Sequence, residues 1–241
     1  MTAFASGEPV NWLLIAVVAI LIGFTINGRR IGFIRTVFTL FSTIIAIMLT
    51  VWVSPIINKQ VQQNEKFMDY TTKKISKIID FKDSGNKVTD EVSFINKLPM
   101  PKAMKESLVE NNNKEVYKTM AVKSFKEYVS ESISRMIINS GVFIIVFIII
   151  SIALGVICFA LDIISKLPVI NGLNKTAGLL TGLIQGIVVV WIGFLILTAF
   201  AGTKVGQDMF ELINSNTFLS VLYNNNMLLK FVTNLGQILL A

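Results

Sequence analysis

The chain has 241 residues, of which 53% are hydrophobic and 15% are charged, and its mean hydropathy is +0.67. Soluble domains carry about 25% charged residues, so this composition excludes an ordinary soluble domain and indicates a membrane protein. The net charge of +7 does not indicate a nucleic-acid partner, because most Lys and Arg lie between Lys59 and Arg135 and are interleaved with acids, unlike a phosphate-binding stripe.

Two apolar runs open the chain, from Val10 to Asn27 and from Ile31 to Val53. Each is long enough to cross a bilayer, which takes about 20 residues of helix, and a lipid-exposed backbone must be helical. They predict a first transmembrane hairpin over residues 10–53. Pro55 marks the predicted end of its second helix. The flank before the first run holds Glu8 and no Lys or Arg, which favours a retained span over a secretory signal.

The short gap between these runs, GRRIGFIR, contains Arg29, Arg30 and Arg35 and no acid. Short loops rich in Arg and Lys stay in the cytoplasm. We therefore expect these arginines, with Lys175 in the second short gap, to anchor both turns at the cytoplasmic face and to contact anionic lipid. Both termini and the central loop are then outside. A site for a specific ligand or partner is the alternative interpretation.

The central segment, residues 54–135, is too long for an idle connection and is patterned like helices. Phe67, Ile75, Ile78 and Ile79 recur at helical spacing, and an apolar stripe from Val122 runs directly into the next apolar run. We expect an extracytoplasmic helical insertion packed on the spans, with its last helix continuous with the third span.

The third and fourth apolar runs, Met136 to Leu161 and Ala177 to Phe200, predict a second transmembrane hairpin over residues 136–200. Residues 201–241 are again amphipathic, and one helical face collects their apolar side chains. We expect this C-terminal helix to lie in the membrane interface or against the insertion. The residues of that face are Leu228, Phe231, Val232, Leu235 and Leu239.

The fourth run contains Gly178, Gly182 and Gly186, each four residues apart, and Gly28 and Gly32 share that spacing. Such spacing removes side chains from one helix face, so that another helix can approach closely. We interpret these glycines as helix-packing positions, through which the chain forms an oligomer. The alternative is a small-residue face that lines a permeation path.

Three polar residues within or beside the spans are candidates for such a path: Thr181, Gln185 and Asp162. Asp162 and Lys166 are spaced as an i,i+4 pair, which is typical of a structural ion pair at a helix end; a proton or ion relay requires Asp162 to face a cavity. The chain has no histidine, no P-loop, no dinucleotide-binding fingerprint and no zinc-ligand spacing. We expect no catalytic residue, no cofactor and no metal.

Several segments resemble the colicin V production protein family. They are NWLLI (Asn11 to Ile15), GRRIGFIRTVFTL (Gly28 to Leu40), LDIISKLPVINGLNKTAGLLTGLIQGIVV (Leu161 to Val189) and SNTFLSVLYNNNMLL (Ser215 to Leu229). The central insertion is similar to that of the longer Gram-positive versions. The resemblance implies a four-span inner-membrane protein that serves toxin production or export and envelope homeostasis, without an established enzymatic mechanism.

The sequence thus predicts an all-α polytopic membrane protein with four transmembrane helices, an extracytoplasmic helical insertion and an amphipathic C-terminal helix. Its expected function is non-enzymatic support of bacteriocin production or export and of the envelope. The alternatives are a small channel or transporter built from two helical hairpins, and a scaffold that recruits partners through the insertion. Expected partners are membrane lipids and further copies or other envelope proteins.

Overall fold

The computed structural model describes residues 11–79, 81, 88–160 and 173–238 of the chain. Every regular element within these ranges is a helix, and four are long and apolar enough to cross a membrane. These are α1 (Trp12–Ile31), α2 (Phe33–Gln62), α7 (Phe125–Ala160) and α8 (Leu173–Ala199). The prediction of an all-α, four-span membrane protein is confirmed.

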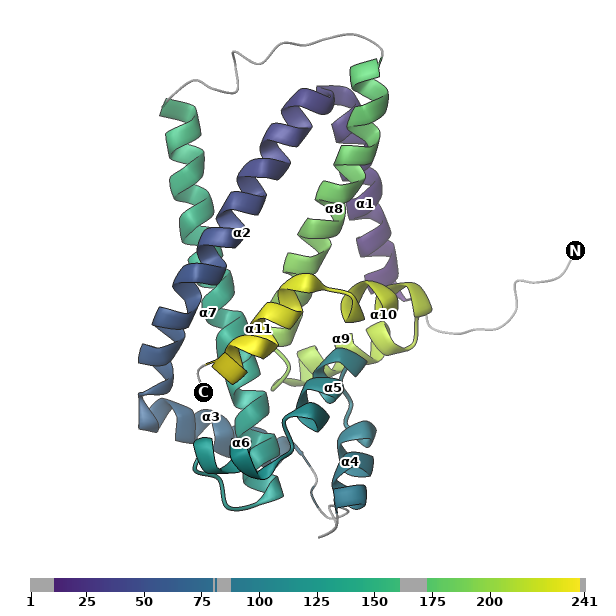
Figure 1. Cartoon of the computed structure of the whole chain (residues 1–241). Coiled ribbons are helices and arrows are strands. Elements are labelled where there is room, and N and C mark those ends of the chain that lie inside the picture. Colours follow the sequence, from purple (N-terminus) through teal and green to yellow (C-terminus); the bar gives the residue numbers. More distant parts are fainter. Residues whose placement is uncertain (1–10, 80, 82–87, 161–172, 239–241) are drawn as a thin grey trace, which may run out of the picture.

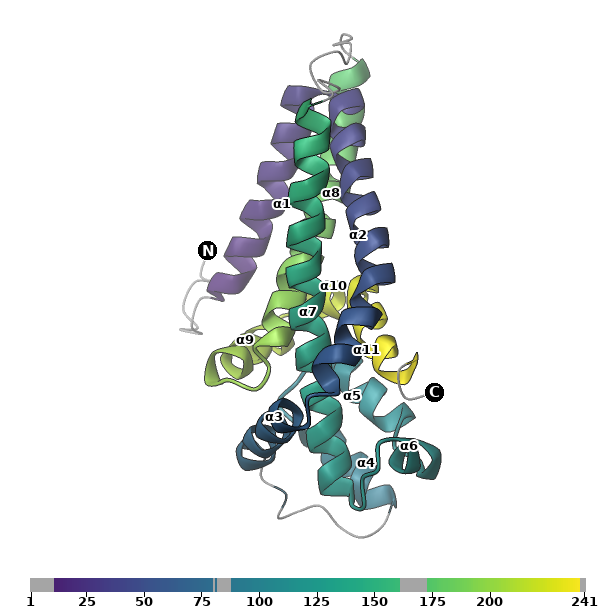
Figure 2. The same cartoon turned by 90° about the vertical axis from the view of Figure 1, so that its left-hand side faces the viewer.

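The four long helices lie side by side, with α1 packed along α8, and α2 packed against both α7 and α8. The turn between α1 and α2 and the first turn of α8 lie at one end, and the short helices gather toward the other (Figures 1 and 2). Helix α7 has 36 residues. At 1.5 Å per residue it is about 54 Å long, longer than the roughly 30 Å hydrocarbon core. It therefore continues beyond the membrane, as the sequence predicts.

The second helix continues past Pro55, where the sequence predicts its end. Helix α2 runs from Phe33 to Gln62 with Pro55 inside it. Proline removes one backbone donor and so leaves the Val51 carbonyl without its helical partner. Membrane helices tolerate this loss, and packing against α3 and α7 supports the part of α2 that follows the proline.

Four short helices between α2 and α7 form a separate group that we call the cap: α3 (Glu65–Ile78), α4 (Val88–Lys97), α5 (Lys102–Glu110) and α6 (Lys114–Thr119). Their core is continuous with α7, because Met104, Leu108 and Tyr128 are all fully buried and the Tyr128 hydroxyl donates to the Leu108 carbonyl at 2.6 Å. The face predicted for α3 is only partly buried. Ile75 is 3% exposed, whereas Phe67 and Ile78 are 45% and 40% exposed.

The C-terminal segment consists of α9 (Lys204–Asn214), α10 (Thr217–Asn224) and α11 (Met227–Ile238). Helix α11 packs on α7 and α8 and also contacts α5 of the cap. Leu228 and Val232 are buried, but Phe231, predicted for the same face, is 47% exposed. The side chains of Leu235 and Leu239 lie outside the described residues.

Candidate functional site

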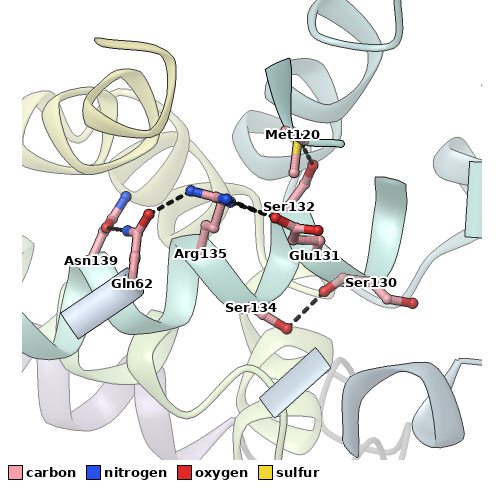
Figure 3. Close-up of polar contacts among 8 residues, drawn as sticks. All are labelled: Gln62, Met120, Ser130, Glu131, Ser132, Ser134, Arg135 and Asn139. Atoms are coloured by element: carbon pink, nitrogen blue, oxygen red, sulfur yellow. Dashed lines mark hydrogen bonds and ion pairs between the residues drawn. The ribbon is translucent and has the colours of Figure 1, made fainter. Parts of the chain in front are cut away.

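A connected group of polar side chains lies where α2, α7 and α11 meet (Figure 3). The Arg135 guanidinium donates to Glu131 Oε1 through Nε at 3.0 Å and Nη2 at 2.7 Å, and its Nη1 donates to Gln62 Oε1 at 2.6 Å. The Gln62 amide in turn donates to Asn139 Oδ1 at 2.7 Å, and Asn139 Nδ2 donates to the Val232 carbonyl at 3.3 Å. We call these five residues the junction.

The junction is shielded from solvent, which raises the cost of leaving any of its groups unpaired. The side chains of Arg135 and Glu131 are each 19% exposed, and Asn139 is 1% exposed. Charge-assisted hydrogen bonds are shorter and stronger than neutral ones, and breaking a buried network leaves unsatisfied polar atoms. The junction therefore fixes the end of α2 and the C-terminal helix on α7, just before the uncharged part of α7 begins at Met136.

A row of polar side chains on α2 leads to the junction from within the membrane. Thr50, Ser54 and Asn58 follow one another at four-residue spacing, and each is 0% exposed. Gln62 continues the same spacing. Within the described part of the chain, the Ser54 hydroxyl and both side-chain amide atoms of Asn58 have no hydrogen-bond partner. A buried amide in this condition is costly, and it can hydrogen-bond water or a polar solute. We call Thr50, Ser54 and Asn58 the polar row.

The predicted packing glycines lie mostly between α1 and α8 of the same chain. A Cβ on Gly28 would overlap the Gly178 carbonyl and come within 2.8 Å of Gly182 Cα. A Cβ on Gly182 would overlap the Phe24 carbonyl, and one on Gly186 would lie 3.2 Å from Phe24 Cβ. The two glycine faces therefore cover each other inside one chain. An oligomer through these faces does not fit this geometry, and a second copy would have to use another surface.

Gly32 holds the turn between α1 and α2 against the start of α8. Its φ of +87° is a backbone conformation that favours glycine, and a Cβ there would overlap the Asn174 side chain. Asn174 Oδ1 accepts from the Ile34 N–H at 3.1 Å and so caps the start of α2. The first hairpin turn and the start of the fourth span thus lie at the same end of the molecule.

The basic residues expected to anchor the turns lie at this end. Arg29, Arg30 and Lys175 are exposed. Arg35 is half-buried, and its buried Nε has no hydrogen-bond partner in the described part of the chain. The exposed side chains of Arg29, Arg30 and Lys175 are available to lipid headgroups. The half-buried Arg35 side chain instead packs on the helices.

Hydrogen bonds of three side chains, Asn226, Trp191 and Tyr223, hold the C-terminal segment on α8. Asn226 Nδ2 donates to the Trp191 carbonyl at 3.0 Å, and Trp191 Nε1 donates to the Leu222 carbonyl at 3.1 Å. The Tyr223 hydroxyl is hydrogen-bonded to Thr198 Oγ1 at 2.7 Å. Burial raises the pKa of the Tyr223 hydroxyl, although the Thr198 hydrogen bond acts in the opposite direction.

The same segment also contacts α1 and the cap. Asn11 caps α1 by accepting from the Leu14 N–H at 3.0 Å, and its Nδ2 donates to the Leu212 carbonyl at 2.7 Å. The Ala103 N–H at the start of α5 donates to Asn224 Oδ1 at 3.0 Å. The C-terminal segment therefore connects both hairpins with the cap.

The polar candidates from the sequence do not form a cluster of their own. Thr181 is 6% exposed and donates to the Ala177 carbonyl of its own helix at 3.1 Å, while Gln185 is 9% exposed. Asp162 and Lys166 lie outside the described residues. Among the residues that the structure describes, no three His, Cys, Asp or Glu side chains are grouped as a metal site.

The sequence interpretation missed the junction and the polar row. Arg135 and Glu131 carried a visible signal, because they are spaced as an i,i+4 pair directly before an uncharged run. The polar row was also visible at four-residue spacing, but the prediction of a helix end at Pro55 separated Asn58 and Gln62 from the span.

Comparison with known proteins places four of the five junction residues inside a recognised family domain. Residues 117–235 match the sequence model of the colicin V production protein family. This part of the chain therefore carries a colicin V production domain. The domain begins in α6 and includes α7, α8, α9, α10 and most of α11. No curated protein and no solved structure matched the chain.

The colicin V production domain contains Glu131, Arg135, Asn139 and Val232 of the junction, whereas Gln62 and the polar row precede it. The N-terminal segments that resemble the family, Asn11 to Ile15 and Gly28 to Leu40, also lie outside the matched residues. Colicin V production proteins are not known as enzymes.

Proposed function

We propose that this protein is a non-enzymatic membrane protein of the bacterial cytoplasmic membrane that supports toxin or bacteriocin production or export and envelope homeostasis. The match to the colicin V production family supports this proposal. The observation that carries it further is the continuity of α7, which belongs to the core of the cap at Tyr128 and becomes a membrane span after Arg135. Such a helix lets the spans hold the cap in one position at the membrane surface.

In this proposal the cap and both termini face the outside, and the two hairpin turns face the cytoplasm. The arginines of the first turn support this orientation, since positive charge in short loops is retained on the cytoplasmic side. The cap is long enough, between Asn64 and Ser124, to be translocated with little regard to its own charge. The cap then lies where exported peptides and other envelope proteins are met.

The test is deletion of the gene from the source bacterium, followed by complementation with the full chain. Two quantities are measured: the toxin activity released into the medium, and the entry of a membrane-impermeant dye into cells. We expect the deletion to lower the first or raise the second, and the full chain to restore both. A deletion strain that matches the parent in both measurements would overturn the proposal.

A second candidate function is a small channel or transporter, and the polar row favours it. Ser54 and Asn58 are buried within a span and lack partners in the described part of the chain, and polar groups at such places mark solute paths in many transporters. Flux of ions or small peptides into liposomes that contain the purified protein would test it. If solutes pass along the polar row, Asn58→Leu should reduce the flux. Absence of flux through wild-type protein would reject the channel or transporter function.

A further inference from the structure

An apolar groove lies between α3, α7 and the turn that connects α8 to α9. Its volume is about 500 Å³, which is within the range of ligand-binding pockets, roughly 300–1,000 Å³. Helix α3 contributes Phe67 and Lys74, α7 contributes Ile138, Gly141 and Ile145, and the turn after α8 contributes Phe200. The groove is separate from the junction and from the polar row.

The groove lies at the level where α7 enters the membrane. Its residues on α7 begin at Ile137, two residues after Arg135, which is the last charged residue before the uncharged run that extends to Ala160. The aromatic residues Phe67, Tyr70 and Phe200 around it are 45%, 65% and 52% exposed. Tyrosine and tryptophan side chains gather at the headgroup level of membrane proteins, and Tyr70 lies on α3. The apolar part of the groove therefore faces acyl chains, and its α3 end faces headgroups.

Lys74 gives the α3 end of the groove a positive charge. It is exposed and lines the groove, and within the described part of the chain it takes part in no ion pair. Its neighbour Lys73 is instead paired with Asp69 at 2.6 Å. One cation at the end of an apolar groove complements an amphiphile with an anionic head and a hydrocarbon tail.

Gly141 leaves room in the middle of the groove. A Cβ at this position would meet nothing within 4 Å, in contrast to the glycines between α1 and α8. A larger side chain at residue 141 can therefore enter the groove without moving the helices.

We propose that this groove binds one anionic phospholipid of the leaflet on the cap side. One acyl chain lies along Ile138, Gly141 and Ile145, and the phosphate lies at Lys74. Occupation of the groove by a lipid would fill the space between α3 and α7 and stabilise the cap on the spans. The proposal does not depend on toxin export.

The test uses the full chain purified in detergent and titrated separately with dioleoylphosphatidylglycerol and dioleoylphosphatidylcholine. Native mass spectrometry measures the fraction of protein that retains lipid. We expect wild-type protein to retain phosphatidylglycerol about fivefold better than phosphatidylcholine, as one lysine at a membrane surface provides. Gly141→Leu should lower retention of both lipids, and Lys74→Gln should remove the preference for phosphatidylglycerol.

Two matched variants separate the groove from general effects of the substitutions. Gly23→Leu places the same side chain in open space on α1, and Lys118→Gln removes the same charge from an exposed site on α6. Both should retain lipid as the wild type does. Equal retention by Gly141→Leu and Gly23→Leu, or equal preference in Lys74→Gln and Lys118→Gln, would overturn the proposal. A dimer that Gly141→Leu converts to a monomer would assign the groove to a second copy of the chain and overturn it as well.

Discussion

Gly28 of α1 lies directly against Gly182 of α8, so that a Cβ on Gly28 would come within 2.8 Å of the Gly182 Cα. No other residue type fits this contact without moving one of the helices. The contact joins the first span of the chain to the last one. The two hairpins are therefore held together by backbone packing near the turn between α1 and α2, and by polar side chains at the opposite end.

Gly182→Ala should destabilise the protein by about 1–3 kcal/mol, the usual cost of overpacking a close contact. The added methyl group would overlap the Phe24 carbonyl and lie 3.1 Å from Gly28 Cα. Thermal unfolding of the purified protein in detergent measures the effect. Gly193→Ala on the same helix is the control, because a Cβ there meets nothing within 4 Å. If both variants unfold at the same temperature, the close contact between α1 and α8 is not present in solution.

Gln62→Leu should destabilise the protein by about 1–3 kcal/mol, because it leaves buried polar atoms unpaired. Arg135 Nη1 loses an acceptor at 2.6 Å, and Asn139 Oδ1 loses a donor at 2.7 Å. Denaturant or thermal unfolding measures the change in free energy. Gln60→Leu makes the same substitution at an exposed position of the same helix and should change stability by less than about 0.5 kcal/mol. Equal free energies of unfolding for Gln62→Leu and Gln60→Leu would show that the junction does not stabilise the fold.

Stability should fall as the pH rises above about 10, the ordinary pKa of tyrosine, and Tyr223 should account for part of this fall. Burial raises the pKa of Tyr223 in the folded protein, so the unfolded chain releases this proton at lower pH than the folded chain does. The stabilisation is fully present below pH 10 and is lost as the pH rises further, by up to about 1.4 kcal/mol per pH unit for one such group.

Unfolding temperatures of wild-type protein and Tyr223→Phe between pH 8 and 11 measure this contribution. The variant should be less stable at pH 8, because it lacks the hydrogen bond to Thr198, and should lose less stability as the pH rises. The pKa of Tyr117 is also raised, mainly by burial and further by the charge of Glu91. The variant therefore keeps part of the dependence of stability on pH. Parallel curves for the two proteins would contradict the role given to Tyr223.

The proposed orientation predicts opposite labelling of the cap and the first turn. Single cysteines replace Lys118 and Arg30 in a Cys158→Ser background, which removes the natural cysteine. A membrane-impermeant maleimide should label residue 118 in intact spheroplasts and residue 30 only after permeabilisation. The reverse pattern would place the cap in the cytoplasm and remove the basis for its proposed role.

The sequence predicts the spans well because long apolar runs leave a helix as the only stable backbone in lipid. It also points to the glycines, since four-residue spacing specifies a side-chain-free helix face, but it does not say which helix covers that face. The covering helix is α1 of the same chain, which the pattern at Gly28 alone did not distinguish from a second copy.

The end of α2 and the junction were not predictable in the same way. Pro55 weakens a helix locally, but tertiary packing decides whether the helix continues, and here it extends to Gln62. The partners of Arg135 are 4 and 73 residues away in the chain. The near one follows from helical spacing, whereas the distant one depends on how the cap places α2 beside α7.

In our proposal, the spans support envelope function by holding the cap through α7 and the junction. Its most direct test is complementation of the deletion strain by wild-type protein, Gln62→Leu and Gln60→Leu at equal abundance in the membrane. Released toxin activity and entry of the impermeant dye are the two readouts. We expect full restoration by wild-type protein and Gln60→Leu, and weaker restoration by Gln62→Leu. Equal restoration by all three proteins, or no restoration by wild-type protein, would contradict it.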